Sequence, residues 1–410
     1  MFNPIVLDPV SKIPKCMAFS SKQMTIAIIL GHDVKLFSLV DGSLLHDFKD
    51  IGRRANQICF DANETKFVLS YENGEIRAHS TETGRHLSSA DLRCKREITS
   101  MLSDAKTYTI VTTSCNGSLS VYDTLEDKNK ITCMRVVREC GEITCLALSR
   151  DLNMIATGDS KGRIRLWSYA TMNARNDRLP RLVDPVLSLT FIDPYPLLLS
   201  SDTSGRIFVW CVKSKATKCM GVLNLIHNST TSSSNFLASA VVDMRVVFEQ
   251  KGGSEICPGI QTGAHLLVMS DSQGFVTVLT LNSIIKTLGL RVVSTESTKR
   301  SRYRVDRNAN HLDSEVETVR HQNVKKLDVK IVSKWRAHST EVKQMCVLRD
   351  PKCVVTMSSK SENIKIWSFG HTSSMCGLVL GELDTVHNRV VSKKWSVPVR
   401  KRVLLIYEHK

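Results

Sequence analysis

Residues 155–167 read Ile-Ala-Thr-Gly-Asp-Ser-Lys-Gly-Arg-Ile-Arg-Leu-Trp, in which an apolar run ends in a polar turn and a second apolar run follows. The same pattern recurs at residues 67–78, 110–122, 197–210 and 266–279. The turn glycines of the first four copies, Gly74, Gly117, Gly162 and Gly205, follow one another at intervals of 43, 45 and 43 residues. A period of this length with one hairpin per repeat is typical of the blades of a β-propeller.

Each copy is predicted to be a two-stranded hairpin. Asn73-Gly74 and Asn116-Gly117 supply the residues least penalised at the positive φ angles that tight hairpin turns require. In the three other copies an aspartate lies three residues before the turn glycine, where it can accept hydrogen bonds from amides of the turn. These aspartates are Asp159, Asp202 and Asp271, and the fifth turn glycine is Gly274.

These features resemble the WD40-repeat family. Trp167-Ser168, Trp210-Cys211 and Trp367-Ser368 occupy the place where the third strand of a WD40 repeat ends in Trp-Asp, and Tyr122-Asp123 is a fourth variant. With two weaker copies at residues 16–37 and 354–367, seven repeats begin near residues 15, 55, 97, 141, 185, 235 and 335. The resemblance implies an all-β fold, a seven-bladed WD40-type β-propeller that forms a single domain over residues 1–410.

The residues expected to build the blades are the turn glycines, the strand-ending tryptophans and one histidine: Gly74, Gly117, Gly162, Trp167, Gly205, Trp210, Gly274, His338 and Trp367. The resemblance implies that His, Ser or Thr, Asp and Trp can form a buried hydrogen-bonded network within a blade. Only the last repeat offers a matching pair, His338 and Trp367. We therefore expect the blades to be held mainly by apolar packing between sheets.

Three segments depart from a plain ring. Residues 298–326 are charged and poor in apolar side chains, which predicts a mobile insertion between the sixth and seventh repeats. A C-terminal extension is expected from about residue 381. Residues 1–8 lack the basic start and apolar core of a signal peptide, and we expect them to form a strand that closes the ring. The apolar stretches are too short to span a bilayer.

The formal net charge of +16 at pH 7 predicts attraction to acidic partners. The candidate basic contact surface consists of Lys299, Arg300, Arg302, Arg304, Arg400, Lys401 and Arg402. The alternative is that these charges are solvated and serve solubility. Nucleic acid is the less favoured partner, because Tyr303 is the one aromatic residue interleaved with the cations and the sequence has no RNA- or DNA-binding motif.

The sequence gives little indication of catalysis or of a cofactor. Its 13 cysteines are scattered without the spacing of a zinc site, which favours free thiols in a reducing compartment and no metal. It has no nucleophile elbow, phosphate-binding loop, zinc-protease motif or kinase motif set. The histidines are interpreted as structural or solvated. If the protein were an enzyme, it would need carboxylates or histidines gathered around the axis of the ring.

Two segments, residues 186–210 and 378–398, resemble parts of large WD-repeat proteins linked to cilia and the cytoskeleton. Relatives of this kind can hold two propellers, so we expect either a shortened member or one half of such a design. The expected function is a non-catalytic scaffold for protein–protein interaction in the cytoplasm, as a cytoskeletal or ciliary component with acidic or cytoskeletal partners. The alternative function is an RNA- or ribonucleoprotein-associated propeller that uses its basic surface.

Overall fold

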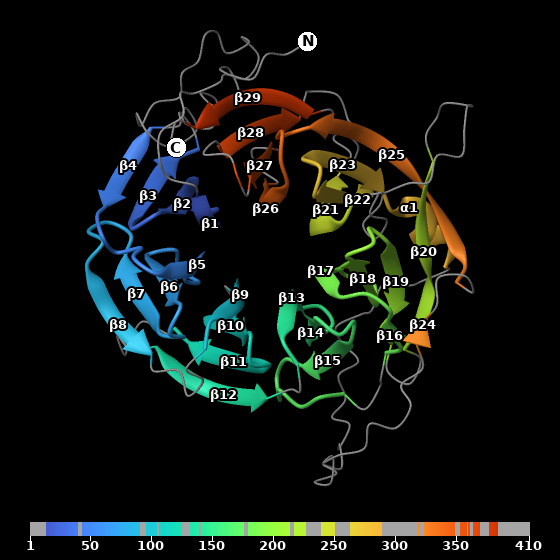
Figure 1. The fold of residues 1–410 in the computed structure, drawn as a ribbon, viewed down its shortest axis with the longest axis horizontal. Helices are drawn as coiled ribbons and strands as arrows, with labels where there is room; N and C mark the ends of the chain where they lie inside the picture. Colours follow the sequence, from blue (N-terminus) through green and yellow to red (C-terminus); the bar gives the residue numbers. More distant parts are fainter. Residues whose placement is uncertain are drawn as a thin grey trace, which may run out of the picture.

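The strands follow one another around a common axis in the computed structural model (Figure 1). The structure describes residues 14–39, 43–90, 96–104, 106–124, 131–138, 141–175, 179–213, 217–226, 239–250, 263–288, 318–319, 324–348, 353–358, 360, 364–369 and 377–383. No helix in these ranges is long and apolar enough to cross a membrane.

Five separate antiparallel sheets make up most of the ring, each running from an innermost strand to the rim. The first contains β1 (Pro14–Ser20), β2 (Thr25–Leu30), β3 (Asp33–Ser38) and β4 (Leu44–Phe48). The second contains β5 (Ala55–Phe60), β6 (Lys66–Tyr71), β7 (Ile76–Ser80) and β8 (His86–Ala90). The third contains β9 (Ile98–Asp104), β10 (Thr109–Ser114), β11 (Ser118–Asp123) and β12 (Thr132–Arg138). The fourth contains β13 (Ile143–Ser149), β14 (Met154–Asp159) and β15 (Ile164–Ser168), and the last contains β26 (Val342–Leu348), β27 (Cys353–Ser358), β28 (Ile364–Phe369) and β29 (Gly377–Leu383).

An eight-stranded sheet occupies the two positions between the fourth and the last sheets. The half of this sheet at the fifth position of the ring contains β17 (Val186–Phe191), β18 (Leu197–Asp202), β19 (Ile207–Cys211) and β20 (Lys218–Ile226). Its sixth-position half contains β21 (Val241–Gln250), β22 (Gly263–Asp271), β23 (Phe275–Thr280) and β25 (Lys326–Arg336), with the short helix α1 (Asn282–Thr287) after β23. The halves join where β25 pairs in parallel with β20 and, further along, antiparallel with β23.

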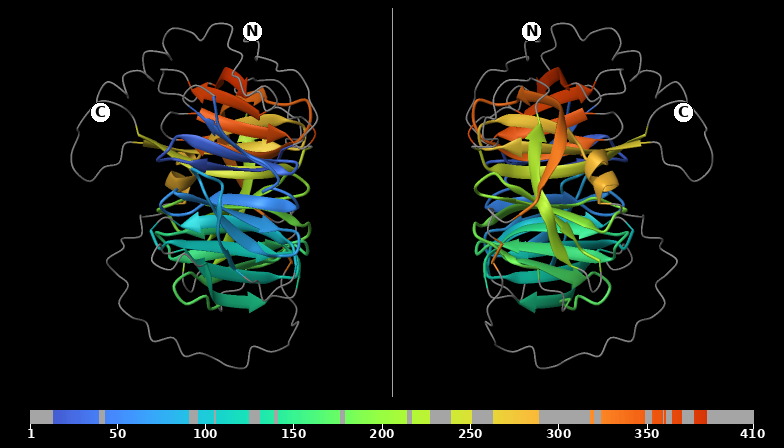
Figure 2. Two further views of the ribbon diagram at one scale, coloured as in Figure 1. Left: turned by 90° about the vertical axis from the view of Figure 1, so that its left-hand side faces the viewer. Right: turned by 90° about the vertical axis from the view of Figure 1, so that its right-hand side faces the viewer.

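The innermost strands establish the ring, because each contacts the next around the axis. Contacts join β1 to β5, β5 to β9, β9 to β13, β13 to β17, β17 to β21, β21 to β26 and β26 back to β1. The described residues therefore form an all-β propeller with seven positions, as the sequence predicted. Figure 2 shows the strands of successive sheets stacked around this ring when it is viewed from its sides.

The turn chemistry explains why the hairpins form where they do. Asp159 Oδ1 accepts hydrogen bonds from the backbone amides of Lys161 and Arg163, at 2.9 and 2.8 Å. Gly162 has a φ of +77°, and a Cβ there would lie 2.4 Å from the carbonyl oxygen of Leu182. Glycine is therefore required at this position for two reasons. The backbone conformation has a positive φ, and the chain that enters the next blade passes too close for a side chain.

The apolar core lies between neighbouring sheets rather than inside a single layer. Trp210 is fully buried in a cluster that combines side chains of the fourth and fifth positions, and Trp167 packs against Val111 and Leu119 of the third sheet. Each strand-ending tryptophan also donates its indole N–H to a hydroxyl within its own blade, Trp167 to Thr157 at 3.1 Å and Trp210 to Ser200 at 2.8 Å.

Polar contacts also join neighbouring blades, beside the apolar clusters that lie between the sheets. Side chains of one blade bond to the backbone of the next near the axis, in a set of contacts that we call the inner belt. It consists of Lys15 with Ala55, Gln57 with Thr99, Thr144 with Val186, Ser201 with Val241, Asp243 with Met345, and Gln344 with Met17. The turn between β1 and β2 adds a contact at the opposite end of the strands, where Ser20 Oγ donates to Glu64 Oε2 of the second blade at 2.5 Å.

The segments predicted to depart from the ring are described only in part. Within 298–326, Thr318–Val319 form β24, which pairs in parallel with β16 (Arg181–Leu182), and Lys326 begins β25. The outermost strand of the last sheet in the described part of the chain is β29. The expected closing strand at residues 1–8 lies outside the described residues, as do residues 384–410 of the predicted C-terminal extension.

Candidate functional site

A hollow of about 640 Å³ lies against the second sheet, where the connection from the first sheet enters it, and we call it the blade 1–2 groove. Four pieces of chain supply its lining: the connection from β4 to β5, the end of β6, the turn between β6 and β7, and β7 itself. The lining residues are Asp50, Ile51, Arg53, Arg54, Tyr71, Glu72, Asn73, Glu75, Arg77 and His79. The β4–β5 connection and the β6–β7 turn emerge at the same face of an up-and-down sheet, so the groove opens on the face that carries the predicted turn glycines.

One wall of the groove is fixed by Arg77. Its guanidinium forms two hydrogen bonds with the Glu75 carboxylate, at 2.7 and 2.8 Å, and lies 4.8 Å from the centroid of the Tyr71 ring. The Tyr71 hydroxyl in turn donates to the carbonyl of Ile51 at 2.9 Å. The hydrogen bonds from Arg77 lower the pKa of Glu75, and burial raises the pKa of Tyr71. This wall is charged but internally neutralised.

The rim of the groove carries two cations of a different kind, Arg53 and Arg54. Both side chains are exposed, and within the described residues no ion pair joins either of them to a carboxylate. The backbone beneath them is well positioned, because the Arg54 carbonyl accepts a hydrogen bond from the Glu72 amide at 3.0 Å. Two unneutralised guanidinium groups on an ordered backbone suit a carboxylate or phosphate from outside the chain.

His79 forms the buried end of the groove. It is 5% exposed, its Nδ1 lies 3.0 Å from the carbonyl oxygen of Gly84, and its ring stacks on Phe67 with centroids 5.4 Å apart. Burial lowers the pKa of His79 to about 4, so the ring is neutral near pH 7. The sequence interpretation of the histidines as structural or solvated agrees with this placement in the case of His79.

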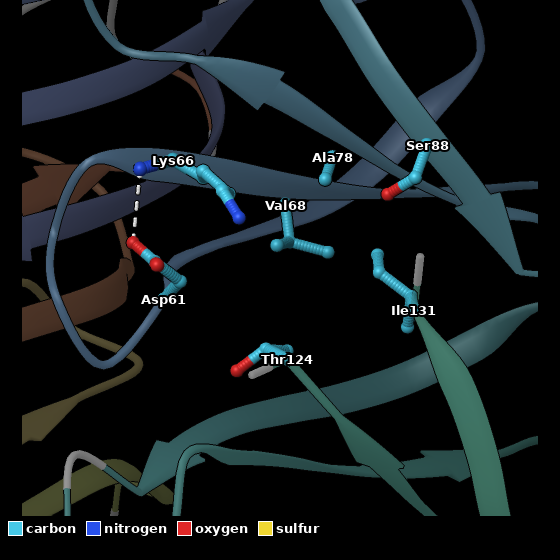
Figure 3. A pocket seen from close by; sticks show the side chains of 7 residues that line it. All are labelled: Asp61, Lys66, Val68, Ala78, Ser88, Thr124 and Ile131. Carbon is cyan, nitrogen blue, oxygen red and sulfur yellow. Dashed lines mark hydrogen bonds between the residues drawn. The ribbon is translucent and has the colours of Figure 1, made fainter. Parts of the chain in front are cut away.

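The groove is lined by charged, amide and aromatic side chains. Within the described parts of the chain, no group of three or more His, Cys, Asp or Glu side chains is placed to hold a metal ion. A second cavity, of about 10 Å³, lies between the second and third sheets and is lined by Asp61, Lys66, Val68, Ala78, Ser88, Thr124 and Ile131 (Figure 3). It is large enough for about one water molecule and excludes a ligand.

The structure places the predicted blade residues in turns and in the core. Gly74, Gly117, Gly162, Gly205 and Gly274 lie in the turns that connect the second and third strands of their sheets, with φ between +77° and +86°. Trp167, Trp210 and Trp367 are buried, and His338 is buried beside Trp367 through Thr356. Of these residues only Gly74 belongs to a turn that lines the groove. The predicted basic residues Lys299, Arg300, Arg302, Arg304, Arg400, Lys401 and Arg402 lie outside the described residues.

Sequence reasoning missed Arg53 and Arg54. The signal that could have found them is the consecutive pair of arginines in a short connection between two predicted blades. Whether these arginines line a groove depends on the face of the ring at which the connection lies. That face is known only once the strand order is known.

Comparison with known proteins supports the fold. The family model described as WD domain, G-beta repeat matches residues 131–168, which hold β12 to β15. The crystal structure of the computationally designed Ika8 protein is 15% identical, with 96% of this chain and 93% of that chain covered and a TM-score of 0.54. A chain in the crystal structure of the Mitotic Checkpoint Complex is 12% identical, with 90% and 93% covered and a TM-score of 0.59.

The comparison with curated proteins gives no match. At 15% and 12% identity the two structural likenesses show the fold alone. Together with the repeat match and the ring of sheets, they lead to one conclusion. The chain is an all-β propeller of the WD40 type, with a WD40 repeat at residues 131–168.

Proposed function

We propose that the chain is a non-catalytic scaffold that binds an acidic segment of another protein through the blade 1–2 groove. WD40 propellers commonly serve as protein-interaction scaffolds. The observation that carries the proposal is the pair of exposed arginines, Arg53 and Arg54, at the rim of a groove in which Arg77 already pairs with Glu75. The exposed carboxylates of Asp50 and Glu72 lie in the same lining. A carboxylate that reaches this rim gains two cationic donors without displacing an internal ion pair.

The setting we propose is the cytoplasm, with a cytoskeletal or ciliary protein as the partner. Support for this setting comes from the sequence alone, through the two segments that resemble cilia-linked WD-repeat proteins. The basic residues near 299–304 and 400–402 favour an acidic partner for the same electrostatic reason. The alternative remains a ribonucleoprotein partner, which the net charge of +16 also suits.

The test is co-purification from lysate with three tagged proteins. One is the wild-type chain, one carries Arg53→Ser with Arg54→Ser, and the matched control carries Arg85→Ser with Lys106→Ser. Arg85 and Lys106 are also exposed, but they lie in turns at the opposite ends of their strands. The control therefore removes the same charge from the other face of the ring.

We expect the groove variant to lose partners that the control retains, and we expect those partners to dissociate as salt rises. Equal recovery with all three proteins would contradict the proposal. Loss of every partner on nuclease treatment would favour the ribonucleoprotein alternative instead.

A further inference from the structure

The rim of the blade 1–2 groove carries acidic as well as basic charge. Its exposed charged residues are Asp50, Arg53, Arg54 and Glu72. Among the residues that the structure describes, no ion pair engages any of these four side chains. Two cations and two carboxylates balance, so the rim is locally neutral on a chain whose formal net charge is +16.

The backbone fixes the order of these charges along the rim. Asp50 lies at the end toward the first sheet, because its amide donates a hydrogen bond to Asp33 Oδ1 of β3 at 3.1 Å. Glu72 lies at the end toward the β6–β7 turn, where its amide donates to the Arg54 carbonyl at 3.0 Å. Arg53 and Arg54 follow Asp50 in the same connection and come between the two carboxylates. The order along the rim is therefore acidic, basic, basic, acidic.

The connection that carries most of these charges is held in place by its surroundings. A Cβ at Gly52 would lie 2.9 Å from the carbonyl oxygen of Asp33, so the connection runs in contact with the backbone of the first sheet. Asp50 and Arg54 both have a left-handed backbone conformation, with φ of +58° and +60°. Such angles are uncommon for residues with a side chain and persist where neighbouring contacts determine the backbone. The rim charges thus project from a preorganised backbone.

Building on the proposed function, we infer that the groove selects a short acidic stretch with a basic residue on either side. Two carboxylates of such a segment meet Arg53 and Arg54, and its flanking cations meet Asp50 and Glu72. A continuous acidic run would set like charges beside both rim carboxylates, and such repulsion is a common source of specificity. The evenly charged backbone of a nucleic acid meets the same repulsion. Asp50 and Glu72 are therefore specificity-determining residues of the groove.

The test uses three fluorescent heptapeptides with capped ends. Every second residue of an extended segment faces the same side, so the charges alternate with serine. The matched peptide is Lys-Ser-Glu-Ser-Glu-Ser-Lys, and the inverted peptide is Glu-Ser-Lys-Ser-Lys-Ser-Glu. These two have the same composition and no net charge, so the overall charge of the protein attracts them alike. The acidic peptide has glutamate at all four charged positions.

Each peptide is titrated with wild-type protein and with two variants, and binding is measured by fluorescence anisotropy. The arginine variant carries Arg53→Ser with Arg54→Ser. The carboxylate variant carries Asp50→Asn with Glu72→Gln, which removes both negative charges and keeps the shape of the side chains. Asparagine also suits the left-handed backbone at residue 50.

The matched control for the carboxylate variant is Glu82→Gln with Asp151→Asn. Both residues are exposed and lie in turns at the opposite ends of the strands from the groove. The control therefore changes the net charge by the same amount away from the rim. The readout is the ratio of two dissociation constants on one protein, which does not depend on the fraction of protein that is folded.

We expect the wild type to bind the matched peptide about tenfold more tightly than the inverted one, because several weak ion pairs replace several repulsions. The arginine variant should lose this preference. In the carboxylate variant the acidic peptide should gain on the matched peptide by about fivefold relative to the wild type, and the control should keep the wild-type ratio.

An unchanged ratio in the carboxylate variant, with binding of both peptides still lost in the arginine variant, would overturn the inference and leave the proposed function standing. Equal binding of the matched and inverted peptides to the wild type would also overturn the inference. Binding of the acidic peptide that does not depend on Arg53 and Arg54 would contradict the proposed function and the inference together.

Discussion

The Trp167 side chain makes contacts both between two blades and within its own blade. Its ring fills the space between the third and fourth sheets, and its indole N–H is satisfied by Thr157 inside its own blade. Its loss would remove apolar contacts across a blade boundary and leave a hydroxyl without its donor.

We predict that Trp167→Ala lowers the free energy of unfolding by about 3–5 kcal/mol, as is usual for a buried tryptophan. Trp167→Phe keeps most of the apolar contact and should cost less. Denaturant unfolding of both variants beside the wild type measures the difference. An unchanged midpoint for Trp167→Ala would show that the residue does not hold the blades together.

Two buried histidines make stability depend on pH. Burial lowers the pKa of both His79 and His338 to about 4, whereas the unfolded chain binds these protons near pH 6.5. As pH falls from about 6.5 to 4, the unfolded state takes up protons that the folded state cannot, so folding stability is lost in this window. Each histidine can contribute up to about 3 kcal/mol.

We therefore predict that His79→Phe, which keeps the stacking on Phe67, reduces the loss of stability between pH 7 and pH 4.5. Unfolding in denaturant at both pH values measures this. The exposed His32, changed to Asn, is the control and should follow the wild type. A pH dependence in His79→Phe equal to that of the wild type would contradict the assignment.

At the scale of elements, an acidic side chain joins the first turn of one blade to that of the next. Glu64 accepts hydrogen bonds from Ser20 Oγ and from the Lys22 amide at 2.5 and 2.6 Å. The same relation recurs between Ser149 and Asp193, again 44 residues apart.

We predict that Glu64→Ala lowers the free energy of unfolding by about 1–3 kcal/mol, because donors of the first blade lose their acceptor. Glu64→Gln retains an oxygen acceptor and should cost less. Glu72→Ala, an exposed change in the next turn of the same blade, serves as the control in thermal unfolding. Equal effects of Glu64→Ala and Glu72→Ala would count against the contact.

The hairpins could be predicted from the sequence because their determinants are local. Asp159 and Gly162 lie within one turn, and the requirement for each is visible in the order of residues. The pairing of β20 with β25 could not be predicted, because Val222 and Lys326 are brought together by the path of the whole chain. The groove was missed because its lining is assembled when β5 pairs with β6, which sets the residues just before Ala55 beside those that follow Tyr71.

At the scale of the molecule, the ring closes between its last and first blades. The side-chain oxygen Oε1 of Gln344 accepts a hydrogen bond from the Met17 backbone amide at 2.9 Å, and Nε2 of Gln344 donates one to the Met17 carbonyl at 2.8 Å. Met17 also belongs to an apolar cluster that includes Val355 and Ile364 of the last blade. Closure thus combines a two-point hydrogen bond with buried apolar area.

We predict that Gln344→Ala weakens closure by about 1–3 kcal/mol, because the Met17 amide loses its acceptor and the Met17 carbonyl loses its amide donor. Hydrogen exchange at the Met17 amide should become faster. Gln344→Glu can still accept from that amide and should protect it. Full protection of Met17 in Gln344→Ala would show that the apolar contacts close the ring without help.

The continuous sheet that links the fifth and sixth blades has a mechanical consequence. Blades that meet through side chains can separate by sliding apart, but separating these two requires rupture of the backbone hydrogen bonds between β20 and β25. If tension is applied across the ring, it acts on a structure that resists unequally around its circumference. Under such a load we expect the propeller to open elsewhere first, while the fifth and sixth blades move as one rigid piece.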